Sequence, residues 1–287
     1  MSNPKRQHWV PKLYLRGFAT PDTAGKDDPD VWLFHKEDGD PFRTSISNVA
    51  AGSFLYSSRS ETGERDFDVE KRLGELENTI APLWRKFANG FVSLEDLTLR
   101  KGISLFISTL FHRNPQRIDD HLTFLDKLKP QTGVTEARAS RVTNEPNKTR
   151  RKVREGLTDG FVHTLLSESG PTAEQLIKKR WAVMVAKKPL FATCDNPVMV
   201  LHDDSTLRGL GFFGGDILVP VSPTRMMILD DKHSEGNNYY ELHPETLGAL
   251  HGITLRYSLR FLISSRPSDE VLSELVALSD RIDRGEV

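Results

Sequence analysis

The chain has a single cysteine, no long apolar run and almost no net charge. One cysteine, Cys194, among 287 residues excludes an internal disulfide and favours a reducing compartment, so we expect a cytoplasmic protein. No apolar run approaches the roughly 20 residues that span a bilayer, and no apolar segment follows the first residues as in a secretory signal, so no membrane association is expected. A formal net charge of −1 gives no global field toward nucleic acid, and any basic surface must be local.

Several familiar catalytic and binding motifs are also missing. The sequence has no Gly-x-x-x-x-Gly-Lys phosphate loop, no His-Glu-x-x-His zinc motif and no Gly-x-Ser-x-Gly nucleophile turn. A single cysteine excludes a structural zinc site built on several thiolates. Cys194 precedes Asp195, whose charge would raise the thiol pKa, so this cysteine is discounted as a nucleophile. These absences leave the cofactor, and any metal, undetermined.

The pattern of apolar residues predicts strands at both ends of the chain and helices between them. Short apolar segments bounded by turn residues predict strands at 30–35, toward Ile46, and at 52–57, 181–186, 190–193, 198–201, 217–221, 226–229 and 261–264. Helical spacing predicts helices over 69–87, kinked or split at Pro82, from Ser93 to about 112, over 118–128, 155–167 and 171–179, and from Ser268 onward. Strands, helices and strands in this order indicate an α+β fold with a central helical layer, as one compact domain over residues 1–287.

A basic stretch lies within residues 131–156, which are the least core-like part of the chain. Its cations outnumber its acids and are Arg138, Arg141, Lys148, Arg150, Arg151, Lys152 and Arg154. We expect an exposed segment whose residues 138–154 bind nucleic acid or a nucleotide.

The opening of the chain carries an unusual amount of apolar surface. Residues 8–18 include Trp9, Tyr14 and Phe18, together with a histidine, His8. Termini are usually polar and frayed, so this segment is expected to dock onto the core, against the half that bears Asp195. His8 is either a satisfied core group or a general acid or base, since imidazole alone titrates near neutral pH.

Two further groups of polar residues lie where predicted elements end. Asp195 and Asn196 precede a proline between two strand-like segments, which suits either a structural turn or a carboxylate held rigidly as a base or ligand. Arg113 and Arg117 lie four residues apart at the end of an apolar helix, where they bind an anion or simply complement the helix dipole. Glu77 borders the apolar stripe of the preceding helix and is the acid of its run most expected to face inward.

These groups occur in an order that resembles a microbial family known as domain of unknown function 4238. The opening pattern His-x-x-Pro-x-x-Tyr-Leu-x-x-Phe is matched from His8 to Phe18. The other matching segments are 54–56, Leu76-Glu77, Arg113-x-Pro115, the Thr-Ser-Asp-Asn-Pro-Val segment at 193–198 with Cys194 in place of serine, and 219–223. The family's closing asparagine has no clear counterpart within 251–265. The resemblance covers nearly the whole chain apart from the basic segment, and it brings no established reaction.

The resemblance implies that its polar members share one region. They are His8, Glu77, Arg113, Asp195 and Asn196. We therefore expect a hydrolase or nuclease-like enzyme acting on a phosphate-containing substrate, with His8 as general acid or base, Asp195 as base or metal ligand, and Arg113 and Glu77 completing the catalytic set. Asn196, Arg117 and Tyr14 are the expected substrate-binding residues. The alternative is a non-enzymatic binding or regulatory protein in which these residues form a structural network.

Overall fold

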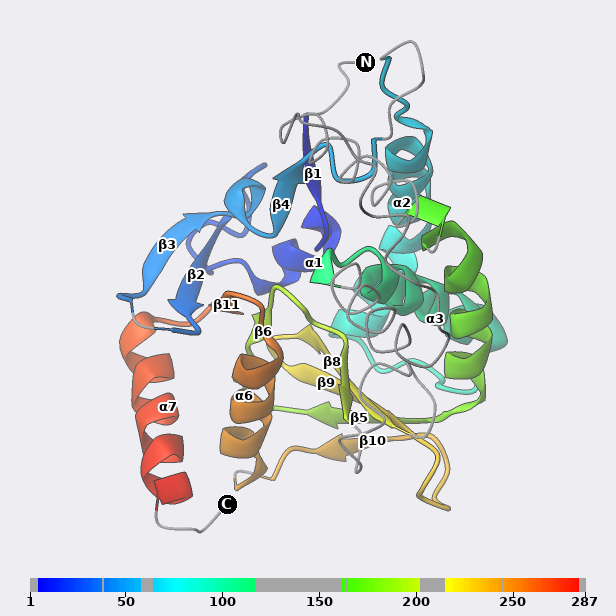
Figure 1. Cartoon of the computed structure of the whole chain (residues 1–287). Coiled ribbons are helices and arrows are strands. Elements are labelled where there is room, and N and C mark those ends of the chain that lie inside the picture. The colour runs from blue at the N-terminus through cyan, green and yellow to red at the C-terminus, as the bar shows by residue number, and fades with distance from the viewer. Residues whose placement is uncertain are drawn as a thin grey trace, which may run out of the picture.

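Three β-sheets frame the part of the chain that the structure describes (Figure 1). The structure is a computed structural model, and it describes residues 5–37, 39–57, 64–116, 162–163, 165–201, 215–243 and 245–283, the last six by their backbone alone. The predicted α+β class is confirmed, because strands lie at both ends of the chain and helices between them. One core cluster draws residues from Val10 to Ile263, so these sheets and helices pack as a single unit.

The largest sheet lies in the second half of the chain and has the strand order β10-β5-β9-β8-β7. Its strands are β5 (Arg180–Val185), β7 (Met199–Leu201), β8 (Asp216–Ser222), β9 (Arg225–Asp230) and β10 (Asn238–Glu241). Neighbours pair antiparallel except β10, which lies parallel to β5. The register shifts between Pro220 and Ser222, at the point where proline cannot donate a ladder hydrogen bond.

The second sheet joins the two ends of the chain. Its order is β3-β2-β11-β6, all antiparallel, from β2 (Asp30–His35), β3 (Phe42–Ser45), β6 (Thr193–Cys194) and β11 (Phe261–Ser264). The predicted strand at 190–193 is therefore wrong for residues 190–192. A two-stranded ribbon pairs β1 (Arg6–His8) with β4 (Ala51–Ser53). The strand predicted at 52–57 ends at Ser53, because Phe54 has a φ of 56°, in the left-handed region that a strand cannot accommodate.

Two long helices form the central layer. Pro82 does not split α2 (Asp68–Asn89), whose buried Ile80, Trp84 and Phe87 anchor both sides of the proline against the core. The Trp84 ring lies 4.8 Å from that of Phe106 on α3 (Leu97–His112). The predicted start of this helix at Ser93 is wrong: Asp96 is the N-cap and accepts hydrogen bonds from the amides of Thr98 and Leu99.

Other helical predictions have mixed outcomes. Residues 165–178 form one continuous helix, so the described end of the helix predicted at 155–167 is helical and joins the helix predicted at 171–179 without a break. The helix predicted at 118–128 and the basic segment at 131–156 lie outside the described residues. None of the helices that the structure describes is long and apolar enough to cross a membrane.

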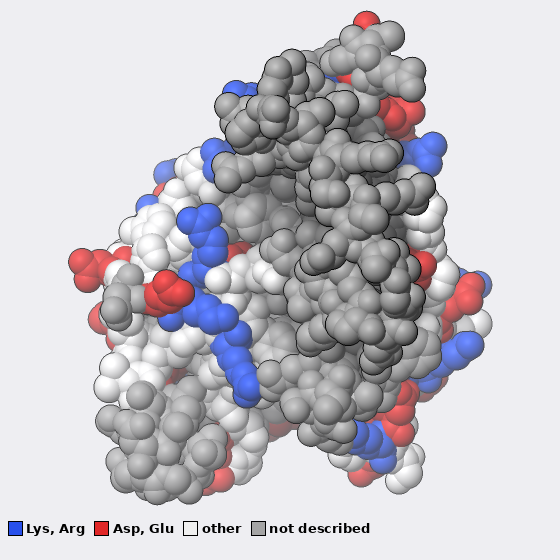
Figure 2. Space-filling model, viewed as in Figure 1, with Lys and Arg blue, Asp and Glu red and all other residues white. Residues whose placement is uncertain are grey.

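The C-terminal helices α6 (Thr246–Tyr257) and α7 (Ser268–Asp283) lie side by side (Figure 1). Where α6 ends, Lys36 Nζ donates to the carbonyls of Arg256 and Ser258, 2.9 and 2.7 Å away. Figure 2 shows a line of Lys and Arg side chains over the face that carries β11 and α6. This face is therefore locally basic although the whole chain is nearly neutral.

A contact between His251 and Glu274 joins the two C-terminal helices. His251, 1% exposed on α6, places Nε2 3.0 Å from the Leu190 carbonyl oxygen and Nδ1 3.1 Å from Glu274 on α7. Arg266 binds both carboxylate oxygens of Glu274, at 2.7 and 2.6 Å. Burial opposes ionisation of Glu274, but the hydrogen bonds from Arg266 and His251 outweigh it and lower the pKa to about 2.

Replacing Glu274 with glutamine is expected to destabilise the protein near neutral pH and to matter less in acid. A lowered pKa contributes stability that is complete above the ordinary value of 4.5 and is lost as the pH falls through about 2. The difference in unfolding free energy between wild type and Glu274→Gln should therefore shrink over this range in urea titrations. Glu270→Gln, at an exposed acid 3.9 Å from Arg266, is the control. A difference independent of pH would contradict the assignment.

Candidate functional site

The opening segment docks onto the strand-rich half through two aromatic residues. It continues from β1 into α1 (Lys12–Leu15) and a short 3-10 helix, η1 (Arg16–Phe18). Trp9 Nε1 donates to the Asp195 carbonyl oxygen at 2.8 Å. The Tyr14 hydroxyl lies 2.7 Å from Thr193 Oγ1 and donates to the Pro220 carbonyl oxygen at 2.5 Å. The expected docking is confirmed, and the structure places Tyr14, predicted to bind substrate, fully inside the core.

His8 lies at the end of β1 with its ring half-buried. Burial, and then the charge of Lys12, lower the pKa of His8 to about 4, so the imidazole is neutral at pH 7. Its Nε2 is buried and has no hydrogen-bond partner in the part of the chain that the structure describes. His8 therefore presents a neutral ring with one nitrogen that forms no hydrogen bond. Its backbone carbonyl accepts a hydrogen bond from a neighbouring residue.

That neighbour is Arg113, the C-cap residue of α3. Its buried guanidinium donates through Nη2 to the His8 carbonyl oxygen and through Nη1 to Glu77 Oε1, 2.7 Å away. Burial works against this charge, but Tyr56 and Glu77 outweigh it and raise the Arg113 pKa. The inward orientation predicted for Glu77 is confirmed.

Sequence reasoning missed two members of this cluster. The Tyr56 hydroxyl donates to the Arg113 carbonyl oxygen at 2.8 Å, and burial raises its pKa to about 12. Burial also raises the pKa of Glu70, whose Oε2 has no partner, whereas Arg113 lowers it. Glu70 lies two helical turns before Glu77, on the same face of α2 as Leu73, so its spacing was a usable signal for an inward carboxylate.

Asp195 and Asn196 lie between β6 and β7, where the chain leaves one sheet for the other. Asp195 is 1% exposed, and its Oδ1 and Oδ2 accept the amides of Leu259 and Arg260 at 2.7 and 3.0 Å. Burial raises the Asp195 pKa while these amides oppose the rise. Asn196 donates to the Tyr257 carbonyl oxygen at 3.0 Å and accepts from Asn114 Nδ2 at 2.7 Å.

The structure thus brings the predicted site residues into two adjacent clusters. His8, Glu77 and Arg113 form one, and Asp195 and Asn196 form the other. They are joined through neighbours in the chain, Trp9 next to His8 and Asn114 next to Arg113. We call these five residues with Trp9 and Asn114 the pattern network. Arg117 lies outside the described residues.

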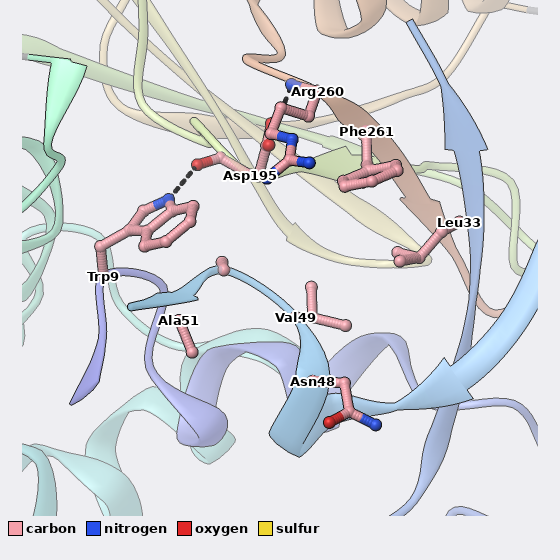
Figure 3. A pocket seen from close by; sticks show the side chains of 9 residues that line it. Trp9, Leu33, Asn48, Val49, Ala51, Asp195, Arg260 and Phe261 are labelled. Carbon is pink, nitrogen blue, oxygen red and sulfur yellow. Dashed lines mark hydrogen bonds between the residues drawn. The ribbon is translucent and has the colours of Figure 1, made fainter. Parts of the chain in front are cut away.

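A small pocket lies beside the network, between the opening segment and the C-terminal half (Figure 3). Its volume is about 60 Å³. It is lined by Trp9, Leu33, Asn48, Val49, Ala50, Ala51, Asp195, Arg260 and Phe261. Ala50 has a φ of 47°, a left-handed conformation that costs a residue with a Cβ about 1 kcal/mol and is often found at ligand-binding positions.

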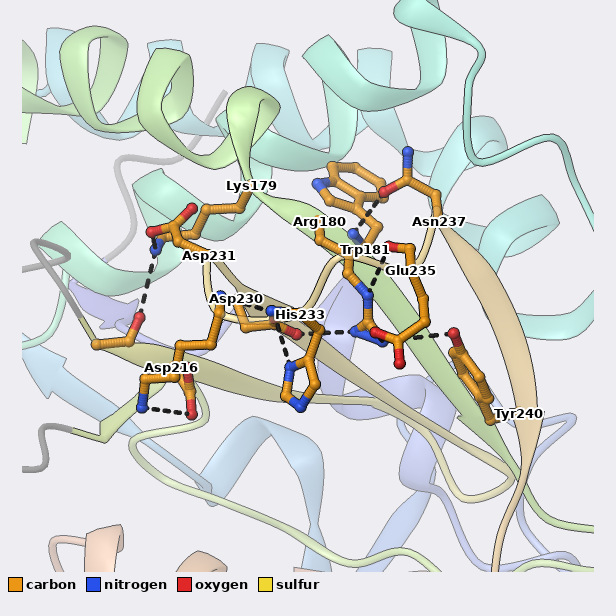
Figure 4. A network of polar contacts seen from close by, with 12 residues as sticks. Lys179, Arg180, Trp181, Asp216, Asp230, Asp231, His233, Glu235, Asn237 and Tyr240 are labelled. Atoms are coloured by element: carbon orange, nitrogen blue, oxygen red, sulfur yellow. Dashed lines mark hydrogen bonds and ion pairs between the residues drawn. The ribbon is translucent and has the colours of Figure 1, made fainter.

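Another polar cluster lies where β5 begins and β9 ends in the large sheet (Figure 4). The carboxylate of Asp230, 1% exposed, binds Arg180 Nη1 at 2.9 Å and the His233 ring at 3.0 Å. Burial opposes its charge, but hydrogen bonds from His233 and the contact with Arg180 lower the Asp230 pKa. Asn237 accepts the Trp181 amide at 2.6 Å. These contacts anchor the ends of β5 and β9, which is a structural task.

The described residues hold no group of three or more His, Cys, Asp or Glu side chains that could bind a metal ion. Cys194 is fully buried, and burial together with the Asp195 charge raises its thiol pKa. A thiol held in this way is a poor nucleophile. In the cluster around Arg113, the titratable side chains that acid–base chemistry would use are His8, Tyr56, Glu70 and Glu77.

Comparisons with known proteins bear on the whole chain. No curated protein and no solved structure matches it. A family model described as "Protein of unknown function (DUF4238)" matches residues 6–268, which include every residue of the pattern network and all of the pocket lining. The chain therefore belongs to the DUF4238 family.

Proposed function

We propose that this chain is a binding protein in which the pattern network is structural and holds a ligand pocket in shape. The proposal rests on one observation: the polar atoms of Asp195 and Arg113 already form hydrogen bonds within the fold. Both carboxylate oxygens of Asp195 accept backbone amides, and both terminal nitrogens of Arg113 donate within the fold. A general base or an anion clamp needs such atoms free for its substrate.

The network joins the elements that surround the pocket. Arg113 ties the end of α3 to the β1 strand, and Asn114 ties it to Asn196. Trp9 and Asp195 then connect the opening segment to the turn before β11, and both residues line the pocket. Fixing these parts relative to one another pre-organises the cavity, which lowers the entropy lost when a ligand binds.

A specific observation also favours a hydrolase as the second candidate. Among the described residues, three buried polar atoms near Arg113 lack hydrogen-bond partners: His8 Nε2, Glu70 Oε2 and Arg113 Nε. Unsatisfied buried groups and shifted pKa values gather at catalytic sites. In such an enzyme the neutral His8 accepts a proton, Glu70 donates one, and Arg113 stabilises the negative charge of a phosphate-containing substrate.

Two further proposals, a cytoplasmic location and a nucleic-acid or nucleotide partner, are compatible with either function. A cytoplasmic location is supported by the single cysteine, Cys194, and its burial. Binding of nucleic acid or a nucleotide through residues 138–154 is supported by the composition of that segment alone.

The two functions are separated by an activity assay on the full chain. We expect no hydrolysis of bis(p-nitrophenyl) phosphate or single-stranded RNA above the protein-free rate, for the wild type and for His8→Gln alike. His243→Gln, at an exposed histidine far from the network in sequence, is the matched control. Turnover that is lost in His8→Gln, while its melting temperature stays within about 2 °C of wild type, would overturn the binding proposal in favour of the hydrolase.

A further inference from the structure

The pocket has two aromatic walls whose positions are fixed. The Trp9 indole is held by its hydrogen bond to the Asp195 carbonyl, and the Phe261 ring lies across the pocket from it (Figure 3). Phe261 is supported by His35, with 5.0 Å between ring centroids, and by Phe42 at 5.9 Å. The pocket therefore presents two aromatic rings at defined positions, beside the polar groups of Asn48, Asp195 and Arg260.

The size of the pocket limits what can lie between the two rings. An apolar cavity of about 150 Å³ accommodates benzene. At about 60 Å³, this pocket fits a smaller group of a few carbon atoms, between Leu33, Val49 and the two aromatic rings. The portion of a ligand that lies between the two rings is therefore short, and the rings favour an apolar group there.

The polar groups at the pocket do not favour a cation. Asp195 is the only acidic lining residue, and both of its carboxylate oxygens already accept backbone amides. Arg260, in contrast, is exposed, and its Cζ lies 5.5 Å from the Phe261 ring centroid. Within the described part of the chain its guanidinium has no carboxylate within ion-pair distance and no hydrogen-bond partner.

Two other cations near the pocket, Arg6 and Lys36, also lack an ion-pair partner among the described residues. Arg6 binds only Asn48, through its side-chain and main-chain oxygens at 3.1 Å each, and Asn48 lines the pocket. The Lys36 amide donates to the Arg260 carbonyl oxygen at 2.9 Å, and its ammonium binds carbonyls only. Neither cation, nor Arg256 beside them, forms an ion pair with a described residue, and Figure 2 shows basic side chains along this face. Uncompensated charge at a concave site attracts anions.

We propose that the pocket binds a small organic oxyanion. A short apolar group lies between Trp9 and Phe261, and a carboxylate or phosphate lies outside against Arg260. This inference rests on the proposed binding function and names its ligand class. A guanidinium suits either oxyanion because its planar N–H groups match two oxygens at once.

Calorimetric titration of the full chain tests the proposal with isobutyrate, isobutyl phosphate, inorganic phosphate and isobutylammonium. We expect the organic anions to bind at least ten-fold more tightly than isobutylammonium, which carries the isobutyl group of isobutyl phosphate with the opposite charge. The better of the two organic anions identifies the oxyanion. Inorganic phosphate should bind more weakly than isobutyl phosphate, since it leaves the apolar slot empty.

Two variants locate the binding. Arg260→Gln should weaken anion binding at least ten-fold, whereas Arg85→Gln, which removes an equal charge from the exposed side of α2, should leave it unchanged. Ala51→Leu fills the pocket without altering charge and should abolish the preference for isobutyl phosphate over phosphate. Equal binding of isobutylammonium, or indifference to Arg260→Gln, contradicts the proposal. Absence of binding by every probe overturns this ligand class but not the binding function, whereas hydrolysis in the assay above overturns both.

Discussion

Replacing Asp195 with alanine is expected to lower the free energy of unfolding by about 2–5 kcal/mol, because two partly buried amides lose their acceptor. Those amides belong to Leu259 and Arg260, and the carboxylate that accepts from both is buried. Removing the carboxylate also removes the cost of burying its charge, which keeps the loss below the sum for two isolated donors. Urea unfolding followed by far-UV circular dichroism measures the change, with an unchanged m-value.

Asp195→Asn keeps one acceptor and should lose less stability than alanine, so it remains informative if the alanine variant does not fold. Asp27→Ala is the matched control, because Asp27 is exposed and its carboxylate has no described partner; its effect should stay within about 0.5 kcal/mol. If the unfolding free energy of Asp195→Ala also stayed within about 0.5 kcal/mol of wild type, the carboxylate would not stabilise the turn before β11. The residue would then be free for chemistry.

Part of the fold follows directly from the sequence. The strands 30–35 and 261–264 are observed at their predicted bounds, because apolar side chains fill both segments and turn residues bound them. The strand β10 was missed, since its four residues, Asn238–Glu241, combine two tyrosines with polar ends. Its place depends on the parallel pairing with β5, a partner more than fifty residues away, and no local pattern encodes such pairing.

Local residue preferences also gave wrong helix predictions at single positions. Ser93 carries a hydroxyl suited to capping, yet it only accepts the Glu95 amide, and Asp96 caps the helix instead. Both residues are good N-caps, so the choice depends on where Leu99 and Ile103 meet the core. Pro82 predicts a kink or break, but buried residues on both sides keep α2 undivided.

Several members of the candidate site were predictable from the sequence, but Tyr56, Glu70 and the contacts between the members were not. The apolar stripe of α2 indicated that Glu77 faces inward. Arg113 was a candidate because it follows the last residue of an apolar helix, His112. Nothing in the sequence shows that Arg113 binds a backbone carbonyl, that of His8, since backbone acceptors carry no residue signature. Only Glu77 of its acidic run was expected to face inward, although Glu70 lies two helical turns before it on the same face.

Arg113→Met is expected to cost about 3–5 kcal/mol of unfolding free energy, since removing one partner of a buried ion pair strands the other. The guanidinium is 3% exposed, and it connects Glu77 on α2 with the His8 carbonyl on β1. Glu77, 23% exposed, can recover some hydration, which favours the lower part of that range. Thermal and urea unfolding of the variant measure the loss.

Glu77→Gln should cost less than Arg113→Met, because a glutamine oxygen still accepts from Nη1 while the His8 carbonyl retains Nη2. Glu75→Gln, two residues away on the exposed side of α2, controls for charge and helix propensity. The double variant completes a cycle whose coupling energy isolates the pair. A negligible coupling, with Arg113→Met as stable as wild type, would show that the pair is dispensable to the fold. Arg113 would then have its charge available for an anionic substrate, and the hydrolase would become the better account of this cluster.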